Sequence, residues 1–481
     1  MGNVMQAKEE RRESLKRSAL GTGVAVVAMG LLAVACRASA QLVDVPPTWG
    51  GDLADRPRLT GNWDGFRDKM GKSGFVFDVD LTQVLQSVAS GGTEQKTAYD
   101  GLVTYTFAID TGRADWWRGG KFQVQGMTQY GLNVQKASGA LLPPNFVAEL
   151  PDFGKDGSAL MELSYTQFVT KEFGFFLGKL PATGGDFNEF AHDYNSQFLY
   201  GNLNLNLITS PYPLSTYGVG LVYVPMPGGT VTLSYLGASG SPTQNNISDS
   251  FKGGVFAIEG RIPVQIAGLG GHQLLGYIWS DKERLSIKQD PSNIANMLLK
   301  EQFPLLNNPG PRLIEIMENY FPGLLNPVQP PNKTTSSWVL YYNFDQFLWS
   351  PTGDPKRGIG IFGRFGVSDK VSNPISYSYN FGVGAKGLLA SRPQDNWGIG
   401  WSRVDINGDF ADFLREKLAL GLTREDAYEA FYTAQLTRSI GASLNVQYID
   451  QAIKKHLDPS TSRLVATDNA FLVALRLYMR F

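Results

Sequence analysis

The chain ends on the stretch FLVALRLYMRF, Phe471–Phe481, in which two kinds of residue alternate. The odd-numbered residues are all large and apolar, whereas the even-numbered set is mixed and includes Arg476 and Arg480. Because successive side chains of a β-strand point to opposite faces, this pattern predicts a strand with one apolar face and one face that accepts charge. The wall of a membrane barrel needs such strands, with lipid outside and water within. A strand of a soluble β-sandwich alternates in the same way. Phe481 favours the barrel, because the machinery that assembles outer-membrane barrels recognises final strands of this kind.

The same period-two pattern recurs along most of the chain. Val103, Tyr105, Phe107 and Ile109, for example, alternate with Thr, Ala and Asp residues. The predicted fold is all-β: a transmembrane antiparallel β-barrel of about sixteen strands, an even number as in single-chain bacterial barrels. The predicted strands lie near 75–88, 97–110, 120–134, 159–170, 172–180, 216–224, 229–237, 253–262, 271–280, 336–349, 358–367, 378–388, 394–403, 428–438, 440–450 and 469–481.

The connections between these strands alternate in length. Brief ones fall at Lys171, Pro225–Gly228 and Ser439, and near 111–119, 263–270, 350–357 and 389–393. Long ones span 135–158, 181–215, 281–335, 404–427 and 451–468. If both termini are periplasmic, short turns lie on the periplasmic side and long loops on the outer side. A soluble β-sandwich has no reason to sort its connections in this way.

The first forty residues read as an export signal. A charged start precedes an apolar stretch, and Ala38-Ser39-Ala40 offers small residues before a cleavage site at Gln41. This cleavage site argues against the alternative of a retained transmembrane helix, while the export route, Sec or twin-arginine, stays open. We therefore divide the chain into a cleaved signal peptide (1–40), an N-terminal periplasmic segment (41–74) and the barrel (75–481). In the periplasmic segment Leu59, Trp63, Phe66 and Met70 are spaced as one face of a short amphipathic helix.

Composition excludes several classes of function. Cleavage after Ala40 leaves 37 basic and 41 acidic residues, a net charge of −4, which does not indicate a nucleic-acid partner. The single cysteine, Cys36, leaves with the signal, so disulfides and thiolate catalysis are excluded. No metal-binding or hydrolase motif occurs, and we expect no cofactor, no metal and no enzymatic activity. A barrel hydrolase using His192 beside Asp193 and an adhesive surface protein are the alternatives from other classes.

A barrel of this size has a wide lumen, so we expect selectivity among solutes to arise where a loop narrows that lumen. The third outer connection, 181–215, is predicted to fold inward and form the constriction, the alternative being a solvated outer loop. Sugars need hydrogen-bonding groups and aromatic faces, and this loop is rich in both. Inward-facing charged and amide side chains of the wall are expected to tune selectivity as a set, whereas each one taken alone is more simply explained as a wetted lumen side chain. The candidate pore-lining and solute-binding residues are Lys121, Gln123, Gln125, Glu162, Lys179 and Arg364 on the wall, and Asp186, Glu189, His192 and Asp193 in the loop.

Several segments resemble a known family. Leu59–Arg67 (LTGNWDGFR) is similar to the motif Leu-Thr-Gly-Asp-Trp-Gly-Gly-Leu-Arg near the start of the carbohydrate-selective porins of the OprB type. The stretch Tyr341–Trp349, the turn Gly387–Asp395, and the closing strands Tyr428–Tyr448 and Phe471–Phe481 resemble that family in the same order, from about residue 59 to the end. The sequence departs from the family at Asn62 and Asp64, and in a longer, Pro/Asn-rich connection 281–335. Within this connection, residues 294–303 and 312–321 are predicted to be helical.

The resemblance implies a sixteen-stranded barrel for passive diffusion of sugars and other small polar solutes in the outer membrane of a Gram-negative bacterium. A general or ion-selective porin without sugar preference is the alternative within this class. Outer-membrane lipid and, through Phe481, the barrel-assembly machinery are the other expected partners. The preferred sugar, the oligomeric state, and whether loops 181–215 or 281–335 gate the pore are left open.

Overall fold

The structure is a computed structural model that describes residues 42–481 except 154–155, 183–185, 210–211, 291–292, 294–295, 298–299, 301–303, 308, 321, 410–420, 459–460 and 462. The predicted signal peptide and its cleavage site lie outside the described residues.

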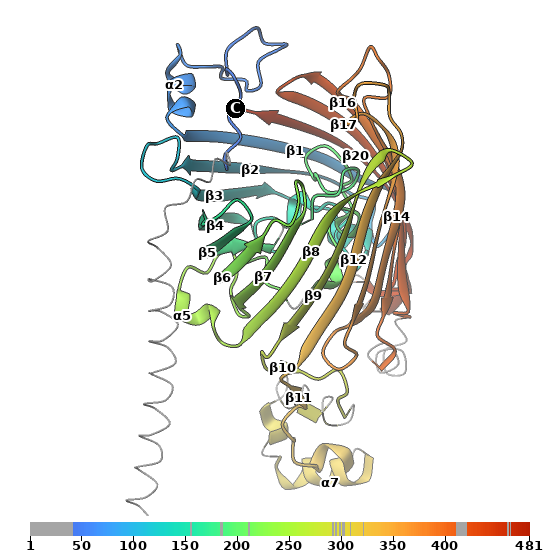
Figure 1. Ribbon diagram of the computed structural model, residues 1–481. Helices are drawn as coiled ribbons and strands as arrows, with labels where there is room; N and C mark the ends of the chain where they lie inside the picture. Colours follow the sequence, from blue (N-terminus) through green and yellow to red (C-terminus); the bar gives the residue numbers. More distant parts are fainter. Residues whose placement is uncertain are drawn as a thin grey trace, which may run out of the picture.

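Sixteen antiparallel strands, each paired with the next along the chain, close into a barrel in which the final strand pairs with the first (Figure 1). The predicted fold class is confirmed, and every predicted strand segment overlaps one of these strands. In β20, Arg480 pairs with Asp80 of β1, and Leu475 pairs with Leu85. The barrel strands are β1 (Phe75–Gly92), β2 (Thr97–Asp110), β3 (Gly120–Gly131), β4 (Gly157–Phe168), β5 (Phe173–Pro181), β6 (Ser215–Tyr223), β7 (Thr230–Gly237), β8 (Gly254–Ile266), β9 (Leu269–Ser280), β12 (Ser337–Trp349), β13 (Gly358–Ser368), β14 (Ile375–Lys386), β15 (Asn396–Ile406), β16 (Arg424–Thr437), β17 (Ile440–Asp450) and β20 (Asp468–Arg480).

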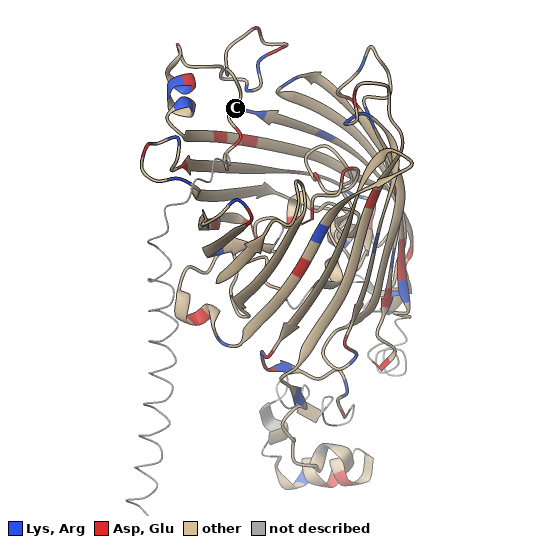
Figure 2. Cartoon of the chain, viewed as in Figure 1, with Lys and Arg blue, Asp and Glu red and all other residues tan. Residues whose placement is uncertain are grey.

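The two faces of the wall differ as the alternation predicts. In β20 the outward side chains of Phe471 and Leu475 are 38% and 56% exposed, whereas inward Leu472 and Arg476 are buried. Aromatic side chains gather near both strand ends, for example Tyr99 with Tyr130 at one end and Trp117 with Tyr165 at the other. Charged residues are sparse along the strands and more frequent in the connections (Figure 2). An apolar outer band edged by aromatic residues is the surface that lipid requires.

One periplasmic turn is short because its two residues adopt left-handed backbone conformations. Ala267 and Gly268 alone connect β8 to β9, with φ angles of 52° and 79°. Two successive residues with positive φ form the tight hairpin turn that matches the twist of the strands. The sequence predicted a longer turn over 263–270, whereas Pro263 is paired with His272 inside the sheet.

The outer connections carry short elements of their own. In the connection after β9, β10 (Arg284–Leu285) pairs with β11 (Lys333–Thr334), and α7 (Pro311–Tyr320) agrees with the helix predicted at 312–321. The helix predicted at 294–303 lies largely outside the described residues. Among the described helices, none is long and apolar enough to cross a membrane. The remaining elements are α3 (Gln135–Ser138), η2 (Val147–Glu149), α4 (Gly201–Asn204), η4 (Leu207–Thr209), α5 (Ile247–Ser250), η5 (Pro304–Asn307), η6 (Pro322–Leu325), β18 (Lys455–Asp458) and β19 (Arg463–Ala466).

The segment before β1 contains α2 (Phe66–Lys72), which begins later than the spacing from Leu59 indicates. Gly61, Trp63, Asp64 and Gly65 all have positive φ angles, so the chain runs through turns before the helix starts. Such backbone conformations are incompatible with a right-handed helix. Phe66 is exposed, whereas Arg67 is buried.

Arg67 joins this segment to the seam between β1 and β20. Its Nη2 atom donates to the carboxylate of Asp78 at 2.6 Å and to the carbonyls of Phe77 at 2.7 Å and Phe481 at 3.0 Å. The guanidinium also lies over the rings of Trp49 and Trp63. A planar, multiply donating cation is suited to holding several oxygens together. We call this group the seam clasp.

Candidate pore and its constriction

The third outer connection folds into the barrel and is held there by wall side chains. Arg364 of β13 donates from Nε to Asp186 at 2.6 Å and from Nη1 to the Leu203 carbonyl at 2.9 Å. Its Nη2 atom donates to the carbonyls of Ala191 and Asn204. The Arg364 side chain is 0% exposed, so the loop covers it completely. A wall cation therefore satisfies loop carbonyls that water would otherwise have to solvate.

Wall carboxylates hold the amides of the same loop. Glu429 of β16 accepts from the backbone N–H groups of Leu199 at 2.7 Å and Tyr200 at 2.8 Å. On β20, Arg476 donates to the carbonyls of Tyr194 and Gln197. Charged groups make the stronger class of hydrogen bond, and here both signs are used to fix irregular backbone inside the barrel.

Residues 135–150 of the second outer connection also fold inward, which the sequence interpretation missed. Glu425 of β16 accepts from the N–H groups of Leu141 at 2.6 Å and Leu142 at 2.9 Å. Phe146 is 0% exposed and its N–H donates to the Leu199 carbonyl, so the two loops are joined. The signal was present in the apolar run ALLPPNFVAEL over 140–150, which is unusual for a solvated outer loop. We call residues 135–150 and 186–208 together the inner plug.

Glycines of the wall make room for the inner plug. Phe190 and Phe198 are buried against strands β12–β16, with ring centroids 4.9 Å from Phe347 and 4.7 Å from Phe431 respectively. A Cβ atom added at Gly360 or at Gly384 would come within 2.6 Å of Phe190 atoms. The alternating glycines of β13 and β14 are thus the positions where the plug approaches the wall closely.

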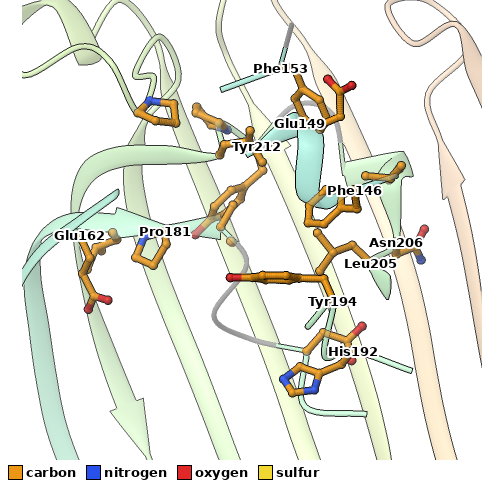
Figure 3. A pocket seen from close by; sticks show the side chains of 18 of the residues that line it. Phe146, Glu149, Phe153, Glu162, Pro181, His192, Tyr194, Leu205, Asn206 and Tyr212 are labelled. Atoms are coloured by element: carbon orange, nitrogen blue, oxygen red, sulfur yellow. The ribbon is translucent and has the colours of Figure 1, made fainter. Parts of the chain in front are cut away.

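The inner plug leaves a cavity of about 1230 Å³ between itself and the wall, lined by residues of the plug and of β3, β4, β5, β7, β8, β9, β12 and β14. We call it the lumen cavity. Figure 3 shows Glu162 on one side of it and Phe146, Tyr194 and Tyr212 on the other. The hydroxyls of Tyr194 and Tyr212 point toward the side where Glu162 lies. Aromatic rings and hydrogen-bonding groups therefore line the lumen cavity together.

Seven of the ten candidate residues border the lumen cavity. Gln123 donates to the Glu162 carboxylate at 2.6 Å, and Ser164 donates to the other oxygen at 2.6 Å, which fixes the orientation of this carboxylate. The cavity is reached by four wall residues and three loop residues from the predicted set, namely Lys121, Gln123, Gln125, Glu162, Asp186, His192 and Asp193.

Lys179, Glu189 and Arg364 lie elsewhere. The Nζ atom of Lys179 donates to the carbonyls of Pro242 and Gln244 and to the Asn245 side chain, so it holds the fourth outer connection. Glu189 forms an ion pair with Lys386 at 2.6 Å, and Arg364 lies beneath the plug. Strand alternation identified the inward face, but it carries no information on which part of that face a loop covers.

The loop residues His192 and Asp193 differ in charge state. Burial lowers the pKa of His192, against the attraction of Asp193 and Asp186, so the imidazole is neutral at pH 7. Burial favours the protonated form of Asp193, but the hydrogen bond from Ser196, the positive charge of Arg480 and the Asn195 N–H together lower its pKa. The Asp193 carboxylate is thus committed to the structure of the loop. In the part of the chain that the structure describes, no cluster of His, Cys, Asp or Glu is arranged to hold a metal ion.

Comparison with known proteins places the chain in a family. The model of the carbohydrate-selective porin family, OprB, matches residues 94–481. The high-pH structure of Pseudomonas putida OprB has a TM-score of 0.69 at 18% identity, covering 90% of this chain and 100% of that one. The low-pH structure of the same protein gives 0.54 at 17% identity, covering 89% and 99%.

Porin B of Pseudomonas aeruginosa is 29% identical over 129 residues, which is 24% of this chain and 27% of that protein. This match thus spans about a quarter of the relative's length, whereas the family model covers the barrel from residue 94 onward. Both resemblance and topology agree with the motifs seen in the sequence. The chain belongs to the OprB family of carbohydrate-selective porins.

Proposed function

We propose that this protein is an outer-membrane porin through which carbohydrates and other small polar solutes diffuse passively. The main support for this proposal is the lumen cavity of about 1230 Å³, which is bounded by the inner plug on one side and by an amide- and carboxylate-rich wall on the other. This volume exceeds the 300–1,000 Å³ or so of ordinary small-molecule pockets, so it accommodates a hydrated saccharide. Family membership supports the same function, and no step of it requires catalysis.

The path is proposed to run between the plug and strands β3, β4, β7 and β8. Along it Lys121, Gln123, Gln125 and Glu162 offer donors and acceptors, while Tyr194 presents a ring from the plug. A pyranose has apolar ring faces and a rim of hydroxyl groups. The Tyr194 ring is suited to the apolar faces, and the polar wall side chains are suited to the hydroxyls. Arg364, Lys179 and Glu189 act indirectly in this proposal, by holding the loops that shape the path.

The test uses purified mature protein in planar bilayers and in liposomes. A sugar porin gives discrete conductance steps, liposome swelling with monosaccharides, and a saturable reduction of conductance when sugar is added. A general porin without sugar preference gives the steps and the swelling but no saturable reduction. Protein that inserts without conductance steps would contradict both and leave the adhesive or enzymatic alternatives.

Export is proposed to remove residues 1–40. Mass spectrometry of the protein isolated from outer membranes is expected to give an N-terminus at Gln41. A retained N-terminus would instead support the membrane-helix alternative. The same preparation would show whether the porin is a monomer or a trimer.

A further inference from the structure

We propose that Phe187 forms a second saccharide subsite in the lumen cavity, next to the Tyr194 ring, so that the pore binds neutral disaccharides more tightly than monosaccharides. This inference rests on the proposed porin function and specifies its substrate class. Three observations support it: the exposure of the Phe187 ring, the anchoring of the residues on either side of it, and the donors and acceptors that lie beside it.

Phe187 differs from the other phenylalanines of the inner plug, all of which lie within the described residues. Phe146, Phe190 and Phe198 are at most 2% exposed, whereas Phe187 is 54% exposed and lines the lumen cavity. Single exposed apolar residues are ordinary on an outer surface. Here the ring lies inside the barrel, and leaving it uncovered forgoes the hydrophobic stabilisation that burial would give. An uncovered ring in a cavity offers the apolar face that a pyranose ring can stack on.

The residues on both sides of Phe187 are fixed to the wall. The preceding residue, Asp186, accepts a hydrogen bond from Arg364 of β13 at 2.6 Å. The following residue, Asn188, donates from its side chain to the carbonyl of Phe344 in β12 at 2.9 Å. The Phe187 side chain therefore cannot turn back into the plug without breaking contacts of its neighbours. A ring that is already held in place loses little freedom when a solute binds, which favours affinity.

Arg261 of β8 orients the Phe187 ring and adds hydrogen-bond donors beside it. Its guanidinium carbon lies over the ring at 5.8 Å from the centroid, and its Nη2 atom donates to the Phe187 carbonyl at 3.3 Å. A guanidinium has five N–H groups, which is more than this contact uses. The carboxylates of Glu189 and Glu259 lie close enough to Arg261 to interact with its charge, so acceptors are near these donors. An apolar ring bordered by donors and acceptors suits a neutral sugar.

The Phe187 subsite adjoins the path proposed above. The ring centroids of Phe187 and His192 are 5.8 Å apart, and both residues line the same cavity as Tyr194. Tyr194 follows His192 by two residues, which is a chain length of at most about 7 Å. Two rings on one loop can thus each stack on one unit of the same disaccharide, and the cavity of about 1230 Å³ has room for both units. Because the two units are linked, the second one binds without a second loss of translational freedom.

The experiment measures how sugars reduce the ion current through the purified mature protein in a planar bilayer. Glucose and maltose, a neutral disaccharide of two glucose units, are added over a range of concentrations. The concentration that gives half of the maximal reduction is determined for each sugar. We expect this half-blocking concentration to be about fivefold lower for maltose than for glucose, which is the factor that one aromatic contact of ordinary strength gives.

Three variants assign the maltose preference to the ring. Phe187→Leu keeps an apolar side chain and loses the aromatic face, so its half-blocking concentration for maltose should rise to the value for glucose. Its open conductance and its response to glucose should stay the same. Phe187→Tyr keeps the ring and should retain the maltose preference. Phe66→Leu is the matched control, because Phe66 is 59% exposed but lies in the segment before the barrel, and this variant should behave as the wild type.

The outcomes distinguish this inference from the function on which it rests. Equal half-blocking concentrations of glucose and maltose in the wild type overturn the second subsite and leave the sugar porin standing. A Phe187→Leu protein with an unchanged maltose response overturns it too. So does one whose conductance and glucose response change together, because Phe187 would then shape the plug. Absence of conductance steps and of saturable block by either sugar would overturn the sugar-porin function itself. Heat-modified gel mobility checks that each variant forms the barrel.

Discussion

Strands β13–β17 and strands β3–β8 look alike in sequence and differ in what covers them. On the first group, inward Phe362, Glu429 and Asn445 are all at most 2% exposed, because the inner plug lies against them. On the second group, inward Lys121 and Gln125 remain partly exposed at the lumen cavity. Both groups alternate with a period of two. The comparison teaches that the alternation specifies the inward face, while the loops decide whether a residue of that face anchors or contacts solute.

The substitution Arg364→Ala is expected to have the largest effect on the difference between the covered and the uncovered strands. The change removes four hydrogen bonds to the plug and leaves Asp186 without its cation, and breaking such a buried pair costs about 3–5 kcal/mol. The plug should leave the wall, so single-channel conductance should rise severalfold and sugar block should disappear. Arg392→Ala, on an exposed periplasmic turn, is the control. Unchanged conductance in a correctly folded Arg364→Ala barrel would show that the plug does not depend on this anchor.

A somewhat smaller effect is expected from Gly384→Val, which crowds the same interface. The added Cβ atom would lie 2.6 Å from the Phe190 Cβ, and overpacking of this kind costs about 1–3 kcal/mol. Permeation of a trisaccharide in liposome swelling should increase relative to the wild type. Gly270→Ala is matched to it, because no atom lies within 4 Å of its added Cβ. If both variants behave alike, the glycine alternation has no role in seating the plug.

On the uncovered side, Gln125→Ala should affect solute and not structure. The residue borders the cavity from β3, and loss of one hydrogen bond to a sugar is worth about 1 kcal/mol, or about fivefold in affinity. The concentration of sugar that halves the conductance should rise by that factor, while the conductance itself stays the same. Gln435→Ala, whose amide bonds to the Thr437 and Ile440 carbonyls near the periplasmic end, is the comparison variant. A change in open conductance would mean that Gln125 shapes the plug.

The smallest effect concerns acid stability at the covered side. Burial opposes ionisation of Glu189, but the charge of Lys386 and its hydrogen bond lower the pKa of this carboxyl below its usual range. A lowered pKa stabilises the fold above the unfolded value of about 4.3, and this contribution is lost as pH falls through the folded value. The denaturation midpoint of the wild type should therefore decrease more between pH 6 and pH 3.5 than that of Glu189→Gln. Parallel pH profiles of the two proteins would contradict the assignment.

The features of the fold and of the pore that could be predicted from the sequence are those that depend on local sequence patterns. All sixteen strands and the order of short and long connections were readable, because side-chain alternation and loop length need no knowledge of distant contacts. The contact of the Leu141 and Leu142 N–H groups with Glu425 was not readable, since it joins residues far apart in the sequence. The role of Arg364 could not be predicted either, because its position in the sequence is compatible both with contacting solute and with anchoring a loop. The start of α2 was misplaced, because apolar spacing takes no account of the positive φ angles at Trp63 and Asp64.

The seam clasp has a consequence for the lifetime of the folded protein. Arg67 reaches Phe481 across 414 residues of sequence, at the one junction where a barrel strand meets a partner that is not its neighbour in the chain. A closed barrel can open only where two neighbouring strands separate. Strands β1 and β20 are the neighbouring pair that no loop connects, so separation is expected there. Arg67 fastens this pair from the segment before β1, and its guanidinium lies over the rings of Trp49 and Trp63. Resistance to detergent and heat should therefore be governed by a residue that never touches the membrane.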